Sequence, residues 1–563
     1  MLKQTIRQLQ NCYQEKNITV EEVVDQVLAS AKKHVHYNCW IYLLEKKEIM
    51  AYVDKLPSPD FEEKPLWGIP FAIKDNIDLA HVPTTAACPE FSYLPEKSAK
   101  VVAQLIHAGA IPIGKTNMDQ FATGLVGTRS PYGATKNALD PELISGGSSS
   151  GSAVAVALGQ VCFALGTDTA GSGRVPAALN NIIGYKAAPG CYSTEGVVPA
   201  CESLDCVSIF ARGMEDICLI DQQLNARATV TSNQNPQPET LLLPDEVEFF
   251  GPYAAMYEAA WQKTVKYFRE SAHVETIEMA QLQQVARSLY EGPFVVERDV
   301  AIGEFADLHS DSIVAPLATI LKQARQADYS AKALFEAQHV CKRVERSLKN
   351  KLTNSLLVLP TCTGTWRIDQ VLADPLFTNS QMGLYTNHCN LLGLSAVAVP
   401  APVASEMPFG ITLFSIPEDE PLLRSFASEL DSTEARTELV VCGLHMRGFP
   451  LEKEMRAHGA EFAYETKTSS DYLLYELHTE PRKPGLFRSN ECGQPIDVEV
   501  WRIPDKKLSQ FIQTIPYPLA IGKVVLENGV EKLGFVCQKY SAEKKKNITH
   551  YGSWRNYQKE LQA

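Results

Sequence analysis

Two glycine- and serine-rich runs lie close together in the chain, at residues 146–152 and 166–174. Glycine tolerates positive φ angles and close backbone approach, so each run can turn sharply, expose a hydroxyl group and point successive N–H groups into one concavity. The small and apolar residues between the runs predict a buried helix over 153–159 and a buried strand over 161–165. The two runs are therefore expected at the ends of neighbouring elements, where an oxyanion site can form.

Either run alone has simpler explanations. A Gly/Ser stretch is more often a flexible loop than a site, and glycine-rich loops also bind phosphate. No Gly-Lys-Ser/Thr sequence follows either run, which argues against a Walker-type nucleotide loop. The choice depends on whether the chain supplies a base that can activate a serine.

A lysine ends an apolar, strand-like run upstream of both serines. Lys74 follows residues 69–73, and an isolated lysine in this position is more often a surface residue. Taken in order, however, Lys74, Ser148 and Ser172 resemble the Ser-Ser-Lys triad of the amidase signature family. The resemblance implies that Ser172 is the nucleophile, that Ser148 relays its proton and that Lys74 is the base.

This assignment makes chemical demands. A serine hydroxyl is a poor nucleophile until a base accepts its proton, and lysine can do this only when it is neutral. Lowering a lysine pKa from about 10.4 to near 7 needs roughly 3 units, or about 4 kcal/mol, from burial or a nearby positive charge. The apolar run before Lys74 is consistent with burial. The resemblance also implies a cis peptide bond before Ser148, which the sequence does not reveal.

The resemblance assigns further residues around the nucleophile. It implies an oxyanion hole made by the backbone of four successive residues: Thr169, Ala170, Gly171 and Ser172. Asp168 and Arg174 flank this segment and are expected to brace it.

Composition and charge narrow the function class. The chain has 563 residues, 45% hydrophobic and 21% charged, which favours a globular protein with at least two domains. A net charge of −13 argues against a nucleic-acid partner. The 14 cysteines include no Cys-x-x-Cys pair, so we expect reduced thiols and neither a metal site nor a cofactor. The first residues lack a signal-peptide core and no apolar run is long enough for a membrane span, so a cytoplasmic enzyme is expected.

The pattern of elements predicts an α/β fold followed by a smaller domain. Helical stripes alternate with short apolar runs up to about residue 230, and apolar runs return at 356–360 and 394–400. The amidase resemblance implies a mixed central sheet layered by helices. After a polar run the pattern changes to short strands, so we expect an amidase domain at 1–432, a linker at 433–437 and a β-rich α+β domain at 438–563.

Other segments narrow the resemblance to the allophanate hydrolases, over essentially the whole chain. They are residues 119–133, 197–208, 289–298 and 383–387. In that family Tyr290 and Arg298 match the anchors of the substrate carboxylate, and Gly124 and Ser149 match other substrate-binding positions. A spacing of eight places Tyr290 and Arg298 on nearby helical turns. An arginine here is otherwise explained by a surface ion pair with Glu297 or Glu304.

The resemblance implies an activity for each domain. The first would hydrolyse allophanate to ammonia and N-carboxycarbamate, which decarboxylates to give two ammonia and two carbon dioxide overall. The second resembles a γ-glutamylcyclotransferase-like fold, with residues 442–448 matching its ligand loop, and would assist decarboxylation. His445 is the first candidate there, followed by His478 and Glu499, although a structural role for His445 is as plausible.

Two other functions remain open. A general amidase or the A chain of a tRNA-dependent amidotransferase would share the triad but would not explain Arg298 or the second domain. An inactive scaffold in a urea-carboxylating assembly would not need the intact triad. The chain has no biotin-attachment motif or ATP-grasp-sized segment, so a urea carboxylase partner would be a separate polypeptide. The family resemblance implies a homodimer.

Overall fold

The computed structural model describes residues 4–225, 236–327, 329–403, 405–431, 436–489, 493–537 and 546–562. It divides into two compact units, residues 1–432 and 433–563. Of the predicted linker, residues 433–435 lie outside the described residues, and residues 436–437 open the first strand of the second unit. Among the described residues, no helix is both long enough and apolar enough to cross a membrane.

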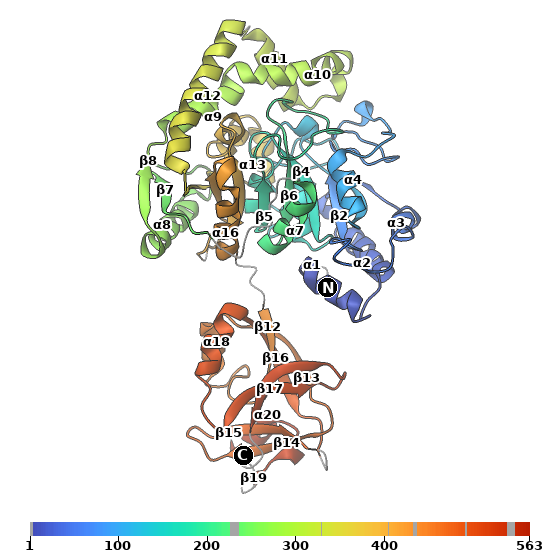
Figure 1. Cartoon of the computed structure of the whole chain (residues 1–563), viewed down its shortest axis with the longest axis vertical. Coiled ribbons are helices and arrows are strands. Elements are labelled where there is room, and N and C mark those ends of the chain that lie inside the picture. The colour runs from blue at the N-terminus through green and yellow to red at the C-terminus, as the bar shows by residue number, and fades with distance from the viewer. Residues whose placement is uncertain are drawn as a thin grey trace. The chain divides into compact units, whose positions relative to one another are not determined.

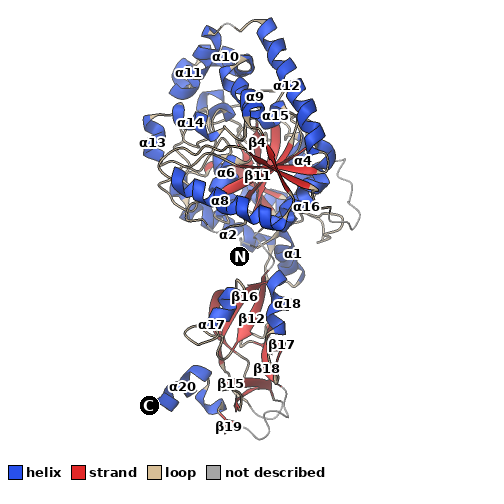
Figure 2. Ribbon diagram, turned by 90° about the vertical axis from the view of Figure 1, so that its left-hand side faces the viewer, coloured by secondary structure: helices blue, strands red, loops and turns tan. Residues whose placement is uncertain are grey.

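Eleven of the described strands form one mixed sheet in the first unit, in the order β1-β3-β2-β4-β6-β5-β10-β11-β9-β7-β8. Most are buried along their whole length because helices cover both faces, which explains their nearly continuous apolar sequences (Figure 2). The strands are β1 (Trp40–Leu43), β2 (Pro70–Lys74), β3 (Ile111–Thr116), β4 (Phe163–Asp168), β5 (Ile183–Lys186), β6 (Cys206–Ala211), β7 (Thr240–Pro244), β8 (Val274–Ile277), β9 (Ser355–Pro360), β10 (Ser395–Pro400) and β11 (Gly410–Ser415).

The longer helices of this unit surround the sheet, and α9 to α12 gather together on one side of it (Figure 1). The expected α/β class with a mixed, helix-layered sheet is confirmed. The helices are α1 (Ile6–Gln14), α2 (Val20–Lys33), α3 (Lys46–Val53), α4 (Lys100–His107), α5 (Ser150–Ala157), α6 (Val175–Leu179), α7 (Met214–Leu224), α8 (Ala254–Ser271), α9 (Ala280–Glu291), α10 (Val296–Leu308), α11 (Ala315–Gln326), α12 (Ala331–Leu352), α13 (Ile368–Ala373), α14 (Phe377–Met382), α15 (His388–Leu391) and α16 (Glu420–Leu430).

The second unit is a small α+β domain, as expected. Its five-stranded sheet has the order β13-β16-β12-β18-β17, and a three-stranded sheet has the order β15-β14-β19. The elements are β12 (Arg436–Val441), α17 (Glu452–Ala457), β13 (Glu461–Lys467), β14 (Tyr472–Leu477), β15 (Lys483–Arg488), β16 (Asp497–Pro504), α18 (Asp505–Gln513), β17 (Leu519–Val525), β18 (Glu531–Cys537), β19 (Lys546–Asn547) and α20 (Trp554–Gln562).

The parallel pairing of β2 with β4 brings the glycine-rich runs and the lysine to one place. Both strands run in the same direction, so their last residues, Lys74 and Asp168, lie at the same edge of the sheet. The two runs lead from this edge into α5 and α6. Side chains at this edge therefore come from segments about 100 residues apart in the sequence.

Candidate active site

Lys74 is fully enclosed and bonded to hydroxyl groups. Its Nζ donates hydrogen bonds of 2.7 Å to Ser148 Oγ and of 2.7 Å to Thr167 Oγ1. Burial lowers the pKa of Lys74 to about 7, although Asp119, Asp205 and Asp168 act in the opposite direction. The group is thus poised between its charged and neutral forms near neutral pH. Ser148 follows a cis peptide bond from Gly147.

Ser172 sits in the second glycine-rich run with its side chain turned toward another loop. Its Oγ donates a 3.4 Å hydrogen bond to the carbonyl oxygen of Gly124. A Cβ at Gly124 would lie 2.5 Å from Asp119 Oδ2, so only glycine fits there. Ser149, expected from the resemblance to bind substrate, uses its hydroxyl on β4: its Oγ donates to Thr167 O at 3.0 Å and accepts from Thr167 N at 3.3 Å. Its side chain braces that strand.

The loop of the predicted oxyanion hole is held from both sides. Thr169 Oγ1 donates to Asp205, whose other oxygen accepts from the backbone N–H of Ala200 at 2.7 Å. Gly171 has a φ of +139°, and a Cβ there would lie 2.3 Å from Thr386 Oγ1. The backbone N–H groups of this loop are therefore fixed by close packing and not by regular secondary structure.

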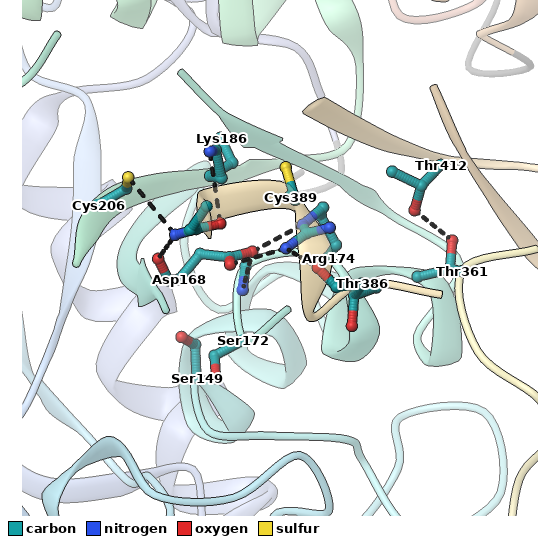
Figure 3. Close-up of polar contacts among 12 residues, drawn as sticks. Ser149, Asp168, Ser172, Arg174, Lys186, Cys206, Thr361, Thr386, Cys389 and Thr412 are labelled. Atoms are coloured by element: carbon teal, nitrogen blue, oxygen red, sulfur yellow. Dashed lines mark hydrogen bonds and ion pairs between the residues drawn. The ribbon is translucent and has the colours of Figure 1, made fainter. Parts of the chain in front are cut away.

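Asp168 and Arg174 form a buried bidentate ion pair beside the nucleophile (Figure 3). Arg174 Nε and Nη2 each lie 2.9 Å from a carboxylate oxygen of Asp168, and Gly173 N donates to the same carboxylate at 3.0 Å. Burial alone would raise the pKa of Asp168, but the guanidinium holds it below its usual value. The pair braces the turn that carries Ser172, in line with the supporting role expected for both residues.

Asp119 organises the loop that faces the nucleophile, and it is not among the site residues predicted from the sequence. Its carboxylate accepts backbone hydrogen bonds from Arg129 N at 2.9 Å, Gly127 N at 3.1 Å and Val126 N at 3.2 Å. A Cβ at Gly147 would lie 2.0 Å from Asp119 Oδ2. The carboxylate therefore links the loop of Gly124 to the start of the first glycine-rich run.

Tyr290 and Arg298 lie close together, but not on successive turns of one helix. The chain breaks at Gly292 and Pro293, so Tyr290 ends α9 while Arg298 belongs to α10. The Arg298 guanidinium carbon lies 4.3 Å from the centre of the Tyr290 ring, a cation–π contact. The break in the helix, and not helical periodicity, produces the contact.

Arg298 is a buried cation that forms no ion pair with the described residues. Its side chain is only 1% exposed, and none of its three nitrogens has a hydrogen-bond partner among those residues. The alternative ion pair with Glu297 is not formed, because Glu297 accepts instead from the backbone N–H and the hydroxyl of Ser203, both at 2.7 Å. A buried guanidinium without partners is costly, so this group is prepared for a ligand that brings oxygen acceptors.

The three candidates in the second unit do not form one site. His445 stacks on Phe535 at 4.8 Å between ring centres, and burial lowers its pKa to about 4, so it supplies no positive charge at neutral pH. The cavity beside it holds about 20 Å³, room for about one water molecule. His478 is exposed after β14.

Glu499 occupies a different position, on the wall of a cavity of about 450 Å³. Its buried carboxylate accepts from Arg447 N at 2.9 Å, Arg555 Nη2 at 3.1 Å and Trp501 Nε1 at 3.0 Å. Arg447 and Arg555 are not predictable as partners from the sequence, because they lie far from Glu499 in the chain. Only the pairing of strands and the position of α20 bring them together.

Comparisons with known proteins agree with this architecture. A model of the amidase family matches residues 20–423. The chain belongs to the amidase family. Residues 437–559 match the allophanate hydrolase C-terminal domain. Among solved structures, Kluyveromyces lactis allophanate hydrolase is 34% identical, with 99% of each chain covered and a TM-score of 0.68.

Two further relatives show how the domains are combined elsewhere in this amidase family. The urea amidolyase of Saccharomyces cerevisiae is 39% identical over 92% of this chain, which spans only 31% of that protein's length. The A chain of the glutamyl-tRNA(Gln) amidotransferase of Methanosarcina acetivorans is 30% identical, but the match covers 72% of this chain. The second unit thus distinguishes this chain from the amidotransferase relatives.

Proposed function

We propose that this chain is an allophanate hydrolase, which releases ammonia from a urea that carries a carboxylate. The observation that carries the proposal is the buried Arg298, which has no hydrogen-bond partner among the described residues and lies beside Tyr290. Allophanate offers a planar carboxylate that a guanidinium fork can bind through two oxygens, while a tyrosine hydroxyl donates a further hydrogen bond. A neutral amide would leave Arg298 buried and unpaired.

In the proposed mechanism Ser172 Oγ attacks the terminal urea carbonyl carbon. Its proton passes through Ser148 Oγ to neutral Lys74, to which Ser148 is hydrogen-bonded. The backbone N–H groups of residues 169–172 stabilise the oxyanion. When the C–N bond breaks, the proton returns through Ser148 to the departing nitrogen, which leaves as ammonia.

The second half of the reaction hydrolyses the acyl-enzyme. Water attacks the acyl carbon, gives a proton to Lys74 by the same relay, and releases Ser172 together with N-carboxycarbamate. This product carries carboxylates on one nitrogen and loses carbon dioxide, so each allophanate yields two ammonia and two carbon dioxide. The Asp168–Arg174 pair holds the Ser172 turn and does not contact the reacting atoms in this scheme.

We further propose that the second unit assists the decarboxylation. Its best-supported position is the cavity at Glu499, where Arg555 offers a guanidinium, whereas the neutral His445 borders too small a space. Support for this role comes from the match to the allophanate hydrolase C-terminal domain.

The setting of the enzyme also belongs to the proposal. A cytoplasmic homodimer, with allophanate supplied by a separate urea carboxylase, agrees with the likeness to one portion of the much longer urea amidolyases.

The direct test measures ammonia released from allophanate and from propionamide by the wild type and by Ser172→Ala. We expect rapid release from allophanate only, and none with Ser172→Ala. Equal rates on both substrates would refute the substrate assignment. Undiminished activity of Ser172→Ala would refute the mechanism.

A further inference from the structure

The proposed reaction centre is enclosed by protein. Lys74 and Ser148 are fully buried, Arg298 is 1% exposed and Ser172 is 2% exposed. A substrate must nevertheless reach Ser172, so some neighbouring space has to connect the centre with solvent.

A cavity of about 560 Å³ shares its walls with the enclosed centre. We call it the outer cavity; its lining includes Leu125, Arg129, Tyr290, Ala324, Asn379 and Asn387. Its volume lies within the range of about 300–1,000 Å³ typical of ligand sites. Tyr290 separates it from Arg298, and Leu125 follows Gly124, the acceptor of the Ser172 hydroxyl.

Arg129 is a second buried cation, and it faces this cavity. Its Nη1 donates to Thr123 O at 3.0 Å and its Nη2 to Pro375 O at 2.7 Å, while Nε has no partner among the described residues. Carbonyl oxygens hold the guanidinium in place without neutralising its charge. Arg287 and Glu291, both exposed, also line the cavity and offset each other. Arg129 therefore supplies the positive charge of the inner wall.

We propose that the outer cavity is the passage by which substrate reaches Ser172, and that Arg129 attracts the substrate carboxylate before Arg298 binds it. The inference rests on the proposed function, because it assumes an anionic substrate. Charge attraction into a partly enclosed cavity raises the local concentration of an anion, which matters in a chain whose net charge is −13.

The passage is tested by narrowing it at its rim. Ala327 lines the cavity and is exposed, so Ala327→Trp places a large side chain there without disturbing the core. Ala318→Trp is the matched control, because Ala318 is exposed on α11 but does not line the cavity. We expect Ala327→Trp to reduce kcat/KM for allophanate about tenfold with kcat within about twofold, and the control to change neither.

A second measurement does not depend on turnover. Ser172 is labelled by a neutral aryl sulfonyl fluoride and by its carboxylated counterpart, and each rate is followed by intact mass. Arg129→Met should lower the ratio of the carboxylated to the neutral rate about tenfold, while Arg129→Lys should largely preserve it. The neutral reagent controls for any disturbance of the loop.

The outcomes separate the two proposals. If the wild type fails to hydrolyse allophanate but Ala327→Trp slows both labelling reactions, the substrate assignment fails and the passage stands. If the wild type hydrolyses allophanate while Ala327→Trp changes neither turnover nor labelling, the passage is overturned. An equal effect of Arg129→Met on both reagents, or an unlabelled Ser172, would overturn the role of Arg129.

Discussion

Lys74 Nζ and Ser148 Oγ are 2.7 Å apart in a space closed to solvent. The enclosure and the hydrogen bond act together, because burial favours the neutral amine while the hydroxyl offers a path for its proton. A lysine that is neutral near pH 7 can act as a base without histidine, which links this contact to amide hydrolysis.

The first prediction concerns pH. Because burial lowers the pKa of Lys74 to about 7, kcat/KM for allophanate should rise about tenfold per pH unit below 7 and level off above it. Protonation at low pH removes the base, which fixes the sign. Steady-state rates between pH 5 and 9 check this. A limb centred near the ordinary lysine pKa, about 10.4, would show that Lys74 is not the titrating base.

The second prediction separates the two hydroxyls that contact Lys74. Ser148→Ala should reduce kcat by about 10²–10⁴, because it removes the proposed relay. Thr167→Val retains the shape at the other contact and should cost much less, because Thr167 only positions the amine. Single-turnover ammonia release measures both. Equal losses in the two variants would contradict the relay through Ser148.

The third prediction concerns stability. Arg174→Met leaves Asp168 charged and buried without its partner, which should lower the free energy of unfolding of the first unit by about 3–5 kcal/mol. Lys332→Met removes an exposed i,i+4 pair with Glu336 and should cost less than about 1 kcal/mol. Urea denaturation compares them. A similar, small loss in both would show that the buried pair does not hold the turn.

The fourth prediction locates the role of the second unit. Arg555→Met should lower the initial ratio of carbon dioxide to ammonia, because it removes the guanidinium beside Glu499. His445→Phe keeps an aromatic ring against Phe535 and should leave the ratio unchanged. Both gases are quantified during one time course. A changed ratio with His445→Phe alone would assign the step to His445.

Much of the central sheet was predictable from the sequence because its strands are buried on both faces. The apolar runs at 356–360 and 394–400 correspond to β9 (Ser355–Pro360) and β10 (Ser395–Pro400). In the second unit, β13 has a mostly exposed or half-exposed pattern, and its apolar residues give no clear period. Such a strand is defined by pairing with a distant partner, here β16, which local sequence does not specify.

The candidate site divides in the same way. Residues within short motifs, such as Lys74 and Ser172, are recognisable from their neighbours in the chain. Asp119 is not, because its role depends on backbone N–H groups that a later loop turns toward it. The separation of Tyr290 from Arg298 also escaped helical periodicity, although Gly292 and Pro293 mark the break.

The most direct test of the central claim compares malonamate with malonamide, which differ in one carboxylate. The wild type should prefer malonamate by about two orders of magnitude in kcat/KM, because Arg298 is buried without an ion pair among the described residues. Arg298→Met should reduce this preference toward one, and Arg298→Lys should give an intermediate value. A wild type without the preference, or an Arg298→Met variant that retains it, would contradict the account.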